Sequence, residues 1–113
     1  MHRVYKDLVL QAKDADTIAA GRRLGHPVRA LKTALPLDMV QAEYNPNISN
    51  ETLMKMGANS LRKAAIDGDI QGGSFMMGQV AGMVSKEQPA AEMIREIFDE
   101  MQDVLKHAQD LIG

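Results

Sequence analysis

The chain has 113 residues, of which 13 are basic and 15 acidic, so its formal net charge at pH 7 is −2. This balance, without a concentrated basic face, argues against a nucleic-acid-binding protein. The absence of cysteine excludes disulfides, thiolate catalysis and cysteine-based zinc sites. No apolar run approaches the roughly 20 residues of a membrane span, and residues 1–13 carry charges without a signal-peptide pattern. We therefore expect a cytoplasmic protein that does not enter a membrane, with residues 1–113 as a single domain.

The first third of the chain predicts a helix followed by a β-hairpin. Apolar residues recur every three or four positions over residues 4–15, which is typical of a helix. Residues 17–20 and 28–31 have the pattern of two short strands, and the segment between them contains two glycines and reads as a turn. We therefore expect a short β-hairpin near residues 17–31.

Two further helices are predicted before residue 70. Pro36 suits the first turn of a short helix over residues 36–43, and an Asn-Pro-Asn sequence ends it. Ser49 or Asn50 then caps a new helix. This helix is expected to run to the Asp-Gly-Asp turn at residues 67–69.

The stretch Ser74–Val84 contains no charged residue. Ser74, Gly78 and Gly82 repeat every four residues, so on a helix they would share one face. Each glycine inside a helix costs about 1 kcal/mol relative to alanine. We expect a helix here, with a neighbouring helix or a ligand in close contact with its glycine face. Gln79 would then face either a ligand or a neighbouring backbone.

The last helix is expected to run from Pro89 to about Ile112. Its apolar stripe is formed by Ile94, Ile97, Phe98, Met101, Leu105, Ala108 and Ile112. The acidic residues of this segment lie mainly away from the stripe and form a solvated face. The predicted fold is thus mostly α, with four to five helices and one short hairpin.

Few residues suggest chemistry by their spacing. Gly72-Gly73-Ser74 could bind an anion through free N–H groups at a helix start, although a tight turn with Ser74 as the N-cap is the simpler interpretation. Arg29 could clamp a carboxylate or phosphate, or form a structural ion pair. His2, His26 and His107 lie far apart and lack the spacing of a metal site. We therefore predict no metal ligand and no catalytic residue.

Three segments resemble one family. Residues 25–32, Gly-His-Pro-Val-Arg-Ala-Leu-Lys, are similar to its "G-H-x-V-R-x-L-K/R-N" stretch, although Thr33 replaces the frequent asparagine. Residues 65–84 resemble its "EGD…GS-x-M-A-G-Q-x-A-G-x-V" signature, with Met77 at the alanine position. His2, Tyr5 and Lys6 resemble the "A-H-x-x-Y-K" that follows its last barrel strand. The family is that of FMN-dependent enoyl-acyl-carrier-protein reductase II and nitronate monooxygenase.

The resemblance implies a TIM-barrel flavoenzyme that binds FMN, with NAD(P)H as the reductant in the reductase branch. A complete barrel needs roughly 250 residues, so the chain would be the last barrel helix and the C-terminal helical subdomain. The barrel strands, the phosphate-binding glycines and the catalytic histidine would lie upstream of Met1, where the family continues. Ser74 and Gln79 would be cofactor-binding residues that face the flavin and substrate pocket.

The expected function is therefore that of a C-terminal fragment of an FMN-dependent oxidoreductase, of the enoyl reductase type of fatty-acid synthesis or of the nitronate monooxygenase type. By itself the chain is expected to be inactive and to bind no cofactor, because positioning of the flavin needs the barrel. Its expected partners are further copies of itself or the missing barrel. The alternative is a stand-alone self-association module that uses the C-terminal stripe and the face of Gly78 and Gly82. A third hypothesis is a small phosphate binder at residues 72–74.

Overall fold

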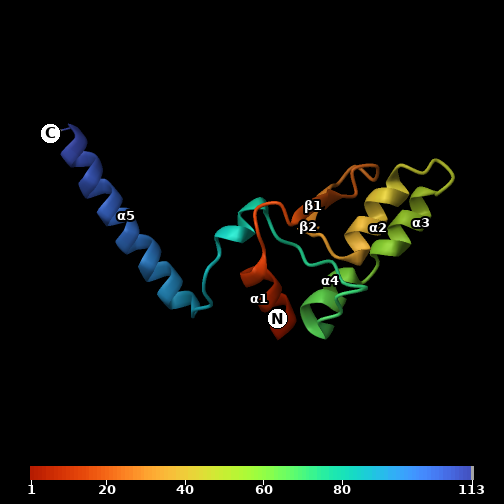
Figure 1. Ribbon diagram of the computed structural model, residues 1–113, viewed down its shortest axis with the longest axis horizontal. Helices are drawn as coiled ribbons and strands as arrows, with labels where there is room; N and C mark the ends of the chain where they lie inside the picture. Colours follow the sequence, from red (N-terminus) through yellow and green to blue (C-terminus); the bar gives the residue numbers. More distant parts are fainter. Residues whose placement is uncertain (113) are drawn as a thin grey trace.

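The computed structural model describes residues 1–112, which form a packed body and one projecting helix (Figure 1). The elements in chain order are α1 (Arg3–Gln11), β1 (Thr17–Ala20), β2 (Val28–Leu31), α2 (Ala34–Glu43), α3 (Asn50–Gly57), α4 (Ser60–Arg62), the π-helical turn η1 (Lys63–Asp67), the 3-10 helix η2 (Gln79–Met83) and α5 (Ala90–Ile112). The predicted class, mostly α with one hairpin, is confirmed.

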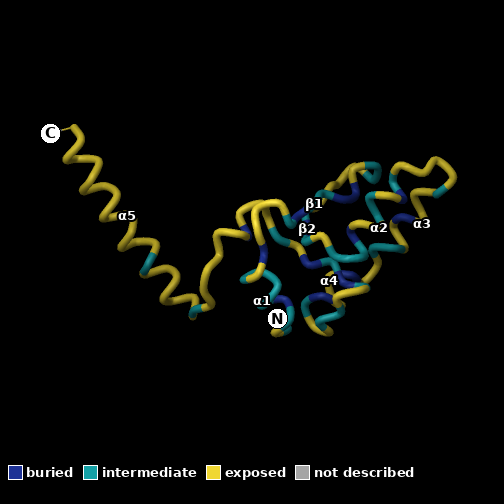
Figure 2. The backbone as a smooth tube through the Cα atoms, viewed as in Figure 1, coloured by how far each residue is buried: buried dark blue, intermediate teal, exposed yellow. Residues whose placement is uncertain are grey.

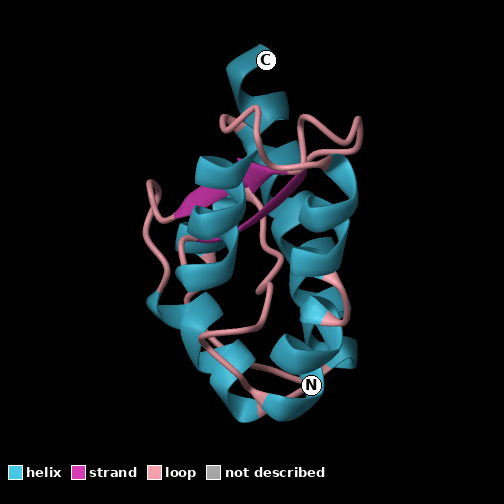
Figure 3. Ribbon diagram, turned by 90° about the vertical axis from the view of Figure 1, so that its right-hand side faces the viewer, coloured by secondary structure: helices cyan, strands magenta, loops and turns pink. Residues whose placement is uncertain are grey.

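The hairpin forms with the predicted strand bounds. β1 and β2 pair antiparallel, and the hairpin packs against α2 (Figure 3). The turn between the strands has Gly21 at φ 90° and Gly25 at φ 84°. Residues with a side chain rarely adopt this backbone region, so the two glycines allow the chain to reverse here.

Local side-chain hydrogen bonds set the start of α3 and the end of α1. The hydroxyl Oγ of Ser49 accepts a hydrogen bond of 3.2 Å from the N–H of Thr52, as the sequence predicts for an N-cap. Helix α1 ends at Gln11 rather than at residue 15. The reason is local, because the carboxylate of Asp16 accepts a hydrogen bond of 2.8 Å from the N–H of Lys13 and turns the chain.

The single helix predicted from residue 50 to the turn at 67–69 is interrupted. α3 ends at Gly57, Ala58 is extended, and Asn59 takes the left-handed conformation with φ 59°. Glycine and asparagine favour such a break, since both have low helix propensity and asparagine tolerates the left-handed region. The chain then restarts as α4 and widens into η1.

The helix predicted over residues 74–84 is wrong. Residues 74–77 are extended and lie along β2: the N–H of Leu31 donates to the carbonyl of Phe75 (2.9 Å), and the N–H of Met77 donates to that of Arg29 (3.3 Å). Helix-like structure is confined to the five residues of η2. The exposed edge of a two-stranded hairpin offers backbone hydrogen bonds that compete with a helix. Ser74 and Gly78 therefore do not share a helix face.

The glycine contact expected from the sequence exists for one of the two glycines. A Cβ at Gly82 would lie 2.8 Å from Oδ1 and 3.1 Å from N of Asp14, so η2 lies close to the backbone that follows α1. At Gly78 nothing lies within 4 Å of such a Cβ. Gly82 thus serves the packing of this chain itself.

The core of the body joins the start and the middle of the chain. Phe75 is fully buried and packs against Tyr5, with ring centroids 5.1 Å apart, and Ala64 of η1 completes the cluster. Burial is concentrated in this body (Figure 2). The extended segment at residues 74–77, which pairs with β2, therefore contributes the main side chain of this core, Phe75.

Helix α5 stands apart from the body, and none of its residues is buried (Figures 1 and 2). The radius of gyration is 18.4 Å, whereas a compact chain of this length would have about 13 Å. The apolar stripe of α5 consists of Met93, Ile94, Ile97, Phe98, Met101, Val104, Leu105, Leu111 and Ile112, which are 44 to 90% exposed.

Candidate functional site

An apolar cavity of about 270 Å³ lies between the hairpin, α2 and α3. Alternate residues of a strand point to the same side, so Val28 and Ala30 of β2 both face this cavity. Its lining is completed by Ala20, Gly21, Leu24, His26, Pro36, Met39, Leu53, Met54, Gly57, Ser60, Leu61 and Ser74. The cavity suits an apolar group, with the two serines as polar contacts.

Ser74 lies in the wall of this cavity. Its N–H donates a hydrogen bond of 3.0 Å to the carbonyl of Ser60, and the following residues pair with β2. The residue is half-buried. The predicted N-cap role is wrong because no helix begins here. Ser74 lines the cavity, and its expected role in cofactor binding stays a prediction.

Gln79 lies elsewhere. It is the first residue of η2 and is exposed, and it does not line the cavity. The structure therefore does not bring Ser74 and Gln79 to one site within the described residues 1–112. The family resemblance implied both residues on one pocket-facing helix, whereas only residues 79–83 of that segment are helical in the structure.

The backbone N–H groups of the glycine turn before Ser74 already bind a carboxylate of this chain, that of Asp69. The carboxylate Oδ1 of Asp69 accepts hydrogen bonds from the N–H groups of Gln71 (3.1 Å) and Gly72 (3.0 Å). A phosphate at this turn would have to displace that carboxylate, so the geometry does not favour the phosphate-binder hypothesis. An Asp side chain commonly accepts hydrogen bonds from backbone N–H groups two or three residues later in the chain. Asp69 is therefore the residue in the sequence from which the hydrogen bonding of this turn could have been predicted.

Arg29 and His2 have structural roles. Nη1 of Arg29 donates to the carbonyl (3.3 Å) and the hydroxyl (3.2 Å) of Thr17, so its partner is the neighbouring strand rather than a carboxylate. Nδ1 of His2 accepts a hydrogen bond of 3.1 Å from the N–H of Val4 and caps α1. His26 is exposed at the rim of the cavity, and His107 is exposed on α5.

Tyr5 fixes the extended segment from the opposite side. Its hydroxyl donates a hydrogen bond of 2.5 Å to the carbonyl of Met76. Burial raises the pKa of the Tyr5 phenol in the folded chain. In the sequence Tyr5 stands out only as part of the motif that it forms with His2 and Lys6, and this motif does not predict the hydrogen bond.

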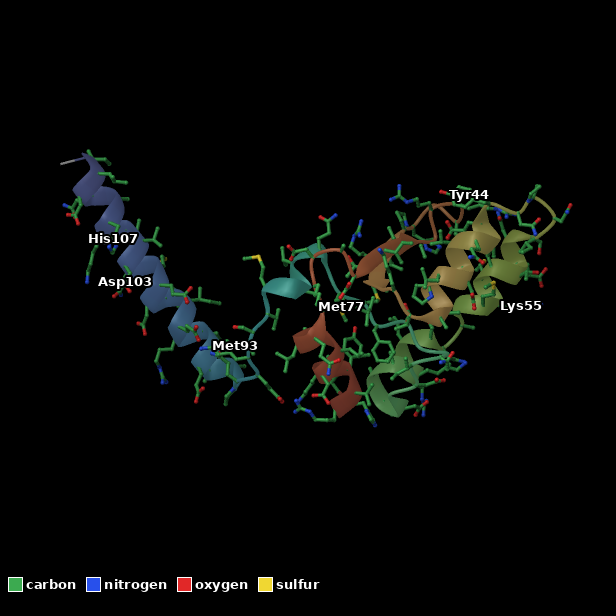
Figure 4. The ribbon with its side chains drawn as sticks, in the orientation of Figure 1. Tyr44, Lys55, Met77, Met93, Asp103 and His107 are labelled. Atoms are coloured by element: carbon green, nitrogen blue, oxygen red, sulfur yellow. The ribbon has the colours of Figure 1, made fainter. Side chains whose placement is uncertain are left out.

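We expect Tyr5→Phe to lower the free energy of unfolding by about 1 kcal/mol at neutral pH, since one buried hydrogen bond is lost. The raised folded-state pKa means that the phenol's contribution is present below about pH 10 and is lost as the pH rises through the folded pKa. Urea unfolding at several pH values should therefore show the gap between parent and variant closing in alkali. Tyr44→Phe is the matched control, because Tyr44 is 82% exposed (Figure 4). An equal effect of the two substitutions would contradict the role of Tyr5.

Within residues 1–112 no group of three or more His, Asp or Glu side chains is placed to hold a metal ion. Across the same described residues, none of the helices has the length and apolar character needed to cross a membrane.

The model of the nitronate monooxygenase family matches residues 1–100 of the chain. Among solved structures, FabK from Thermotoga maritima is similar over 96% of this chain and 34% of its own, with 34% sequence identity and a TM-score of 0.87. A single-substitution mutant of FabK from the same organism is similar over 96% of this chain and 31% of its own, with 29% identity and a TM-score of 0.77. The chain thus spans about a third of the length of these structures. A search of the curated proteins found no match.

Proposed function

Because the chain belongs to the nitronate monooxygenase family, we propose that it is the C-terminal helical part of a cytoplasmic FMN-dependent oxidoreductase and supplies one wall of its substrate pocket. The observation that carries this proposal is the likeness to FabK over 96% of the chain, together with an apolar cavity that has Ser74 in its wall. The family resemblance of the signature at residues 65–84 supports the same assignment.

We favour an enoyl thioester over a nitronate as the substrate class of the whole enzyme. Both solved structures reported above are FabK, a name used for enoyl-acyl-carrier-protein reductase II, and the body of this chain follows them closely. A cavity lined mainly by aliphatic side chains and methionine suits a hydrocarbon chain better than a small charged nitronate.

The described residues do not make a flavin site by themselves. The cavity lining contains no Lys or Arg to meet a phosphate, and the N–H groups of Gln71 and Gly72 already bond to Asp69. A flavin would therefore have to be held mainly by residues outside this chain. We expect the isolated chain to show no visible flavin absorbance and no turnover, and NAD(P)H would be used only by the assembled enzyme.

The contribution of these residues is one of shape and polarity. β2 and α3 give the cavity its apolar walls, and the pairing of residues 74–77 with β2 fixes where the Ser74 hydroxyl stands. This hydroxyl is a hydrogen-bond donor in an apolar setting, where a well-placed donor orients a ligand carbonyl. Gln79 would reach a ligand only from the exposed side of η2.

A chimera tests the proposal. The C-terminal third of Thermotoga maritima FabK is replaced by residues 1–113, and NAD(P)H oxidation is measured with an enoyl thioester and, separately, oxidation of an alkyl nitronate. We expect flavin binding and enoyl-dependent oxidation in the chimera. Flavin binding with nitronate oxidation alone would overturn the substrate class. A folded chimera that binds no flavin would overturn the assignment of this part.

Within the same chimera, Ser74→Ala is expected to lower kcat/KM about tenfold, which corresponds to one hydrogen bond of roughly 1.4 kcal/mol to the bound substrate. Ser85→Ala is the matched control, because Ser85 is exposed in the segment before α5. Equal kinetics for the two variants would remove Ser74 from the site.

One observation supports the alternative that the chain is a self-association module. The uncovered stripe of α5 is a surface that favours association. The second surface invoked for it, the face of Gly78 and Gly82, does not exist as a helix face, since Gly82 packs on Asp14 and only η2 is helical there. Association through α5 is compatible with the enzyme proposal.

A further inference from the structure

The cavity between the hairpin, α2 and α3 has a buried floor and an open rim. On the floor Ala20 and Ala30 of the hairpin are 4% and 2% exposed, and Leu53 of α3 is fully buried. At the rim Met54 is 63% exposed and Leu61 is 54% exposed. The hollow therefore lies between elements of this chain that pack on one another (Figure 1), and it is not part of an outer face.

The hollow exists because small residues face it. Ala20 is paired with Val28 across the hairpin, and Ala30 lies two residues further along β2, so all three face the same side. The two methyl groups leave space that the larger side chains common in strands would fill. On the helical side Gly57 has no side chain, and a Cβ there would lie 3.6 Å from Cε of Met39. Because protein interiors rarely leave voids larger than a water molecule, a hollow of about 270 Å³ indicates space for a ligand.

The cavity follows the length of β2. Ser60 and Ser74 are joined by the hydrogen bond of 3.0 Å from the N–H of Ser74 to the carbonyl of Ser60, and the segment after Ser74 pairs with β2 at Ala30. From there β2 runs back through Val28 to the turn of the hairpin, where Leu24 lines the cavity. The cavity thus has a serine end, at Ser60 and Ser74, and a turn end, at Leu24.

The turn end is fixed in position. Leu24 is the apolar side chain that the turn contributes to the lining, and it is half-buried. The guanidinium of the neighbouring Arg23 donates hydrogen bonds to the carbonyl of Asn45 (3.2 Å) and to the carbonyl of Ile48, both in the loop between α2 and α3. His26 is exposed at the rim. Leu24 therefore stands as a wall across this end, on a turn that is tied to the helices.

The volume of the cavity gives the size of the ligand. An apolar cavity of about 150 Å³ holds one benzene molecule, which is about 25 Å³ for each carbon. By the same proportion a cavity of about 270 Å³ holds about ten carbons. Two methionines, Met39 and Met54, belong to its lining, and methionine adapts its shape to flexible apolar groups. The cavity therefore suits an unbranched hydrocarbon chain of limited length.

We propose that this cavity receives the hydrocarbon tail of the substrate, with the carbonyl at the serine end and the tip of the tail at Leu24, and that it limits the tail to about ten carbons. The inference rests on the proposed function, because an enoyl thioester supplies such a tail. Ala20 and Leu24 set the limit, since both lie at the turn end, whereas Ala30 lies at the serine end.

The first test uses the 113-residue chain and straight-chain alcohols, which carry the tail without a thioester. Alcohols of about 4–14 carbons bracket the expected limit, and their affinity is measured by displacement of a fluorescent apolar dye. Each further methylene should tighten binding about fourfold, because burying one is worth about 0.8 kcal/mol. The rise should stop at about ten carbons, where the cavity is filled. An absence of binding, or a rise that continues to the longest alcohol, would overturn the proposal.

Two variants should move the limit in opposite directions. Leu24→Ala removes about three carbons from the end wall and should raise the limit to about thirteen, whereas Ala20→Leu should lower it to about seven. Ala19→Leu is the matched control, because Ala19 faces the other side of β1. Circular dichroism checks that each variant is folded, and Leu24→Ala keeps the test decisive if Ala20→Leu does not fold. A limit that Leu24→Ala leaves unmoved, or that Ala19→Leu moves equally, contradicts the assigned roles.

The FabK chimera separates this inference from the proposed function. With enoyl thioesters of the same lengths, kcat/KM should stop rising at the length found with the alcohols, and Leu24→Ala should shift both limits together. Turnover that shows no such limit would overturn the role of the cavity and leave the proposed function standing. A limit in the alcohol series combined with a folded chimera that lacks turnover would overturn the proposed function, while the cavity remains a binding site for hydrocarbon tails.

Discussion

Phe75→Ala is expected to remove a large part of the free energy of unfolding of the body. Phe75 is fully buried and joins Tyr5 of α1 to Ala64 of η1, so its ring connects segments about sixty residues apart. Replacing a buried phenylalanine by alanine costs about 3–5 kcal/mol, which is a large part of the roughly 5–15 kcal/mol that holds a domain together. A body this small has few other large buried side chains to compensate, Leu53 being the other fully buried one.

The measurement is a urea titration followed by circular dichroism, in which the midpoint should fall sharply for Phe75→Ala. Phe98→Ala is the matched control, since the sequence holds two phenylalanines and Phe98 is 56% exposed on α5. Phe98→Ala should change the free energy of unfolding by no more than about 0.5 kcal/mol relative to the parent. A Phe75→Ala chain as stable as the Phe98→Ala chain would mean that the core lies elsewhere.

The parts of the fold that the sequence predicted correctly are those set by local chemistry. The hairpin bounds follow from two glycines with positive φ, and the start of α3 follows from the Ser49 cap. α5 begins one residue after the predicted Pro89, with its apolar stripe as expected. In each case the deciding interactions lie within a few residues of one another.

The predictions that proved wrong concern segments whose structure depends on contacts between residues far apart in the sequence. Residues 74–77 became extended because the edge of β2, more than forty residues earlier, offers hydrogen bonds and Phe75 reaches the core beside Tyr5. Ser74, Gly78 and Gly82 repeat every four residues as on a helix face, but in this segment the spacing does not reflect a helix. With that helix gone, Ser74 stays beside a cavity, whereas Gln79 moves to an exposed turn.

The same reasoning gives a second large effect, at Gly73. A Cβ there would lie 3.0 Å from both Cα and N of Ala64 and would press against the carbonyl oxygen of Asp69. These are backbone atoms of η1 and of the turn after it, and they cannot rotate away as a flexible side chain could. The side chain of Asp69 also orders this turn by accepting a hydrogen bond from the N–H of Gly72. A displacement of Ala64 or Asp69 would therefore disturb the positions of Ser74 and Phe75.

We therefore expect Gly73→Ala to cost about 1–3 kcal/mol, the range of overpacked interiors, and to loosen residues 74–77 from β2. Hydrogen exchange of the Leu31 amide, which bonds to the Phe75 carbonyl, reports that loosening directly. Gly78→Ala is the control four residues past Ser74: it meets nothing within 4 Å and has φ −80°, so alanine there should be neutral or stabilise by up to about 1 kcal/mol. If Gly73→Ala behaved like Gly78→Ala, with unchanged protection at Leu31, the turn would not be what fixes Ser74, and the cavity wall would owe its shape to β2 alone.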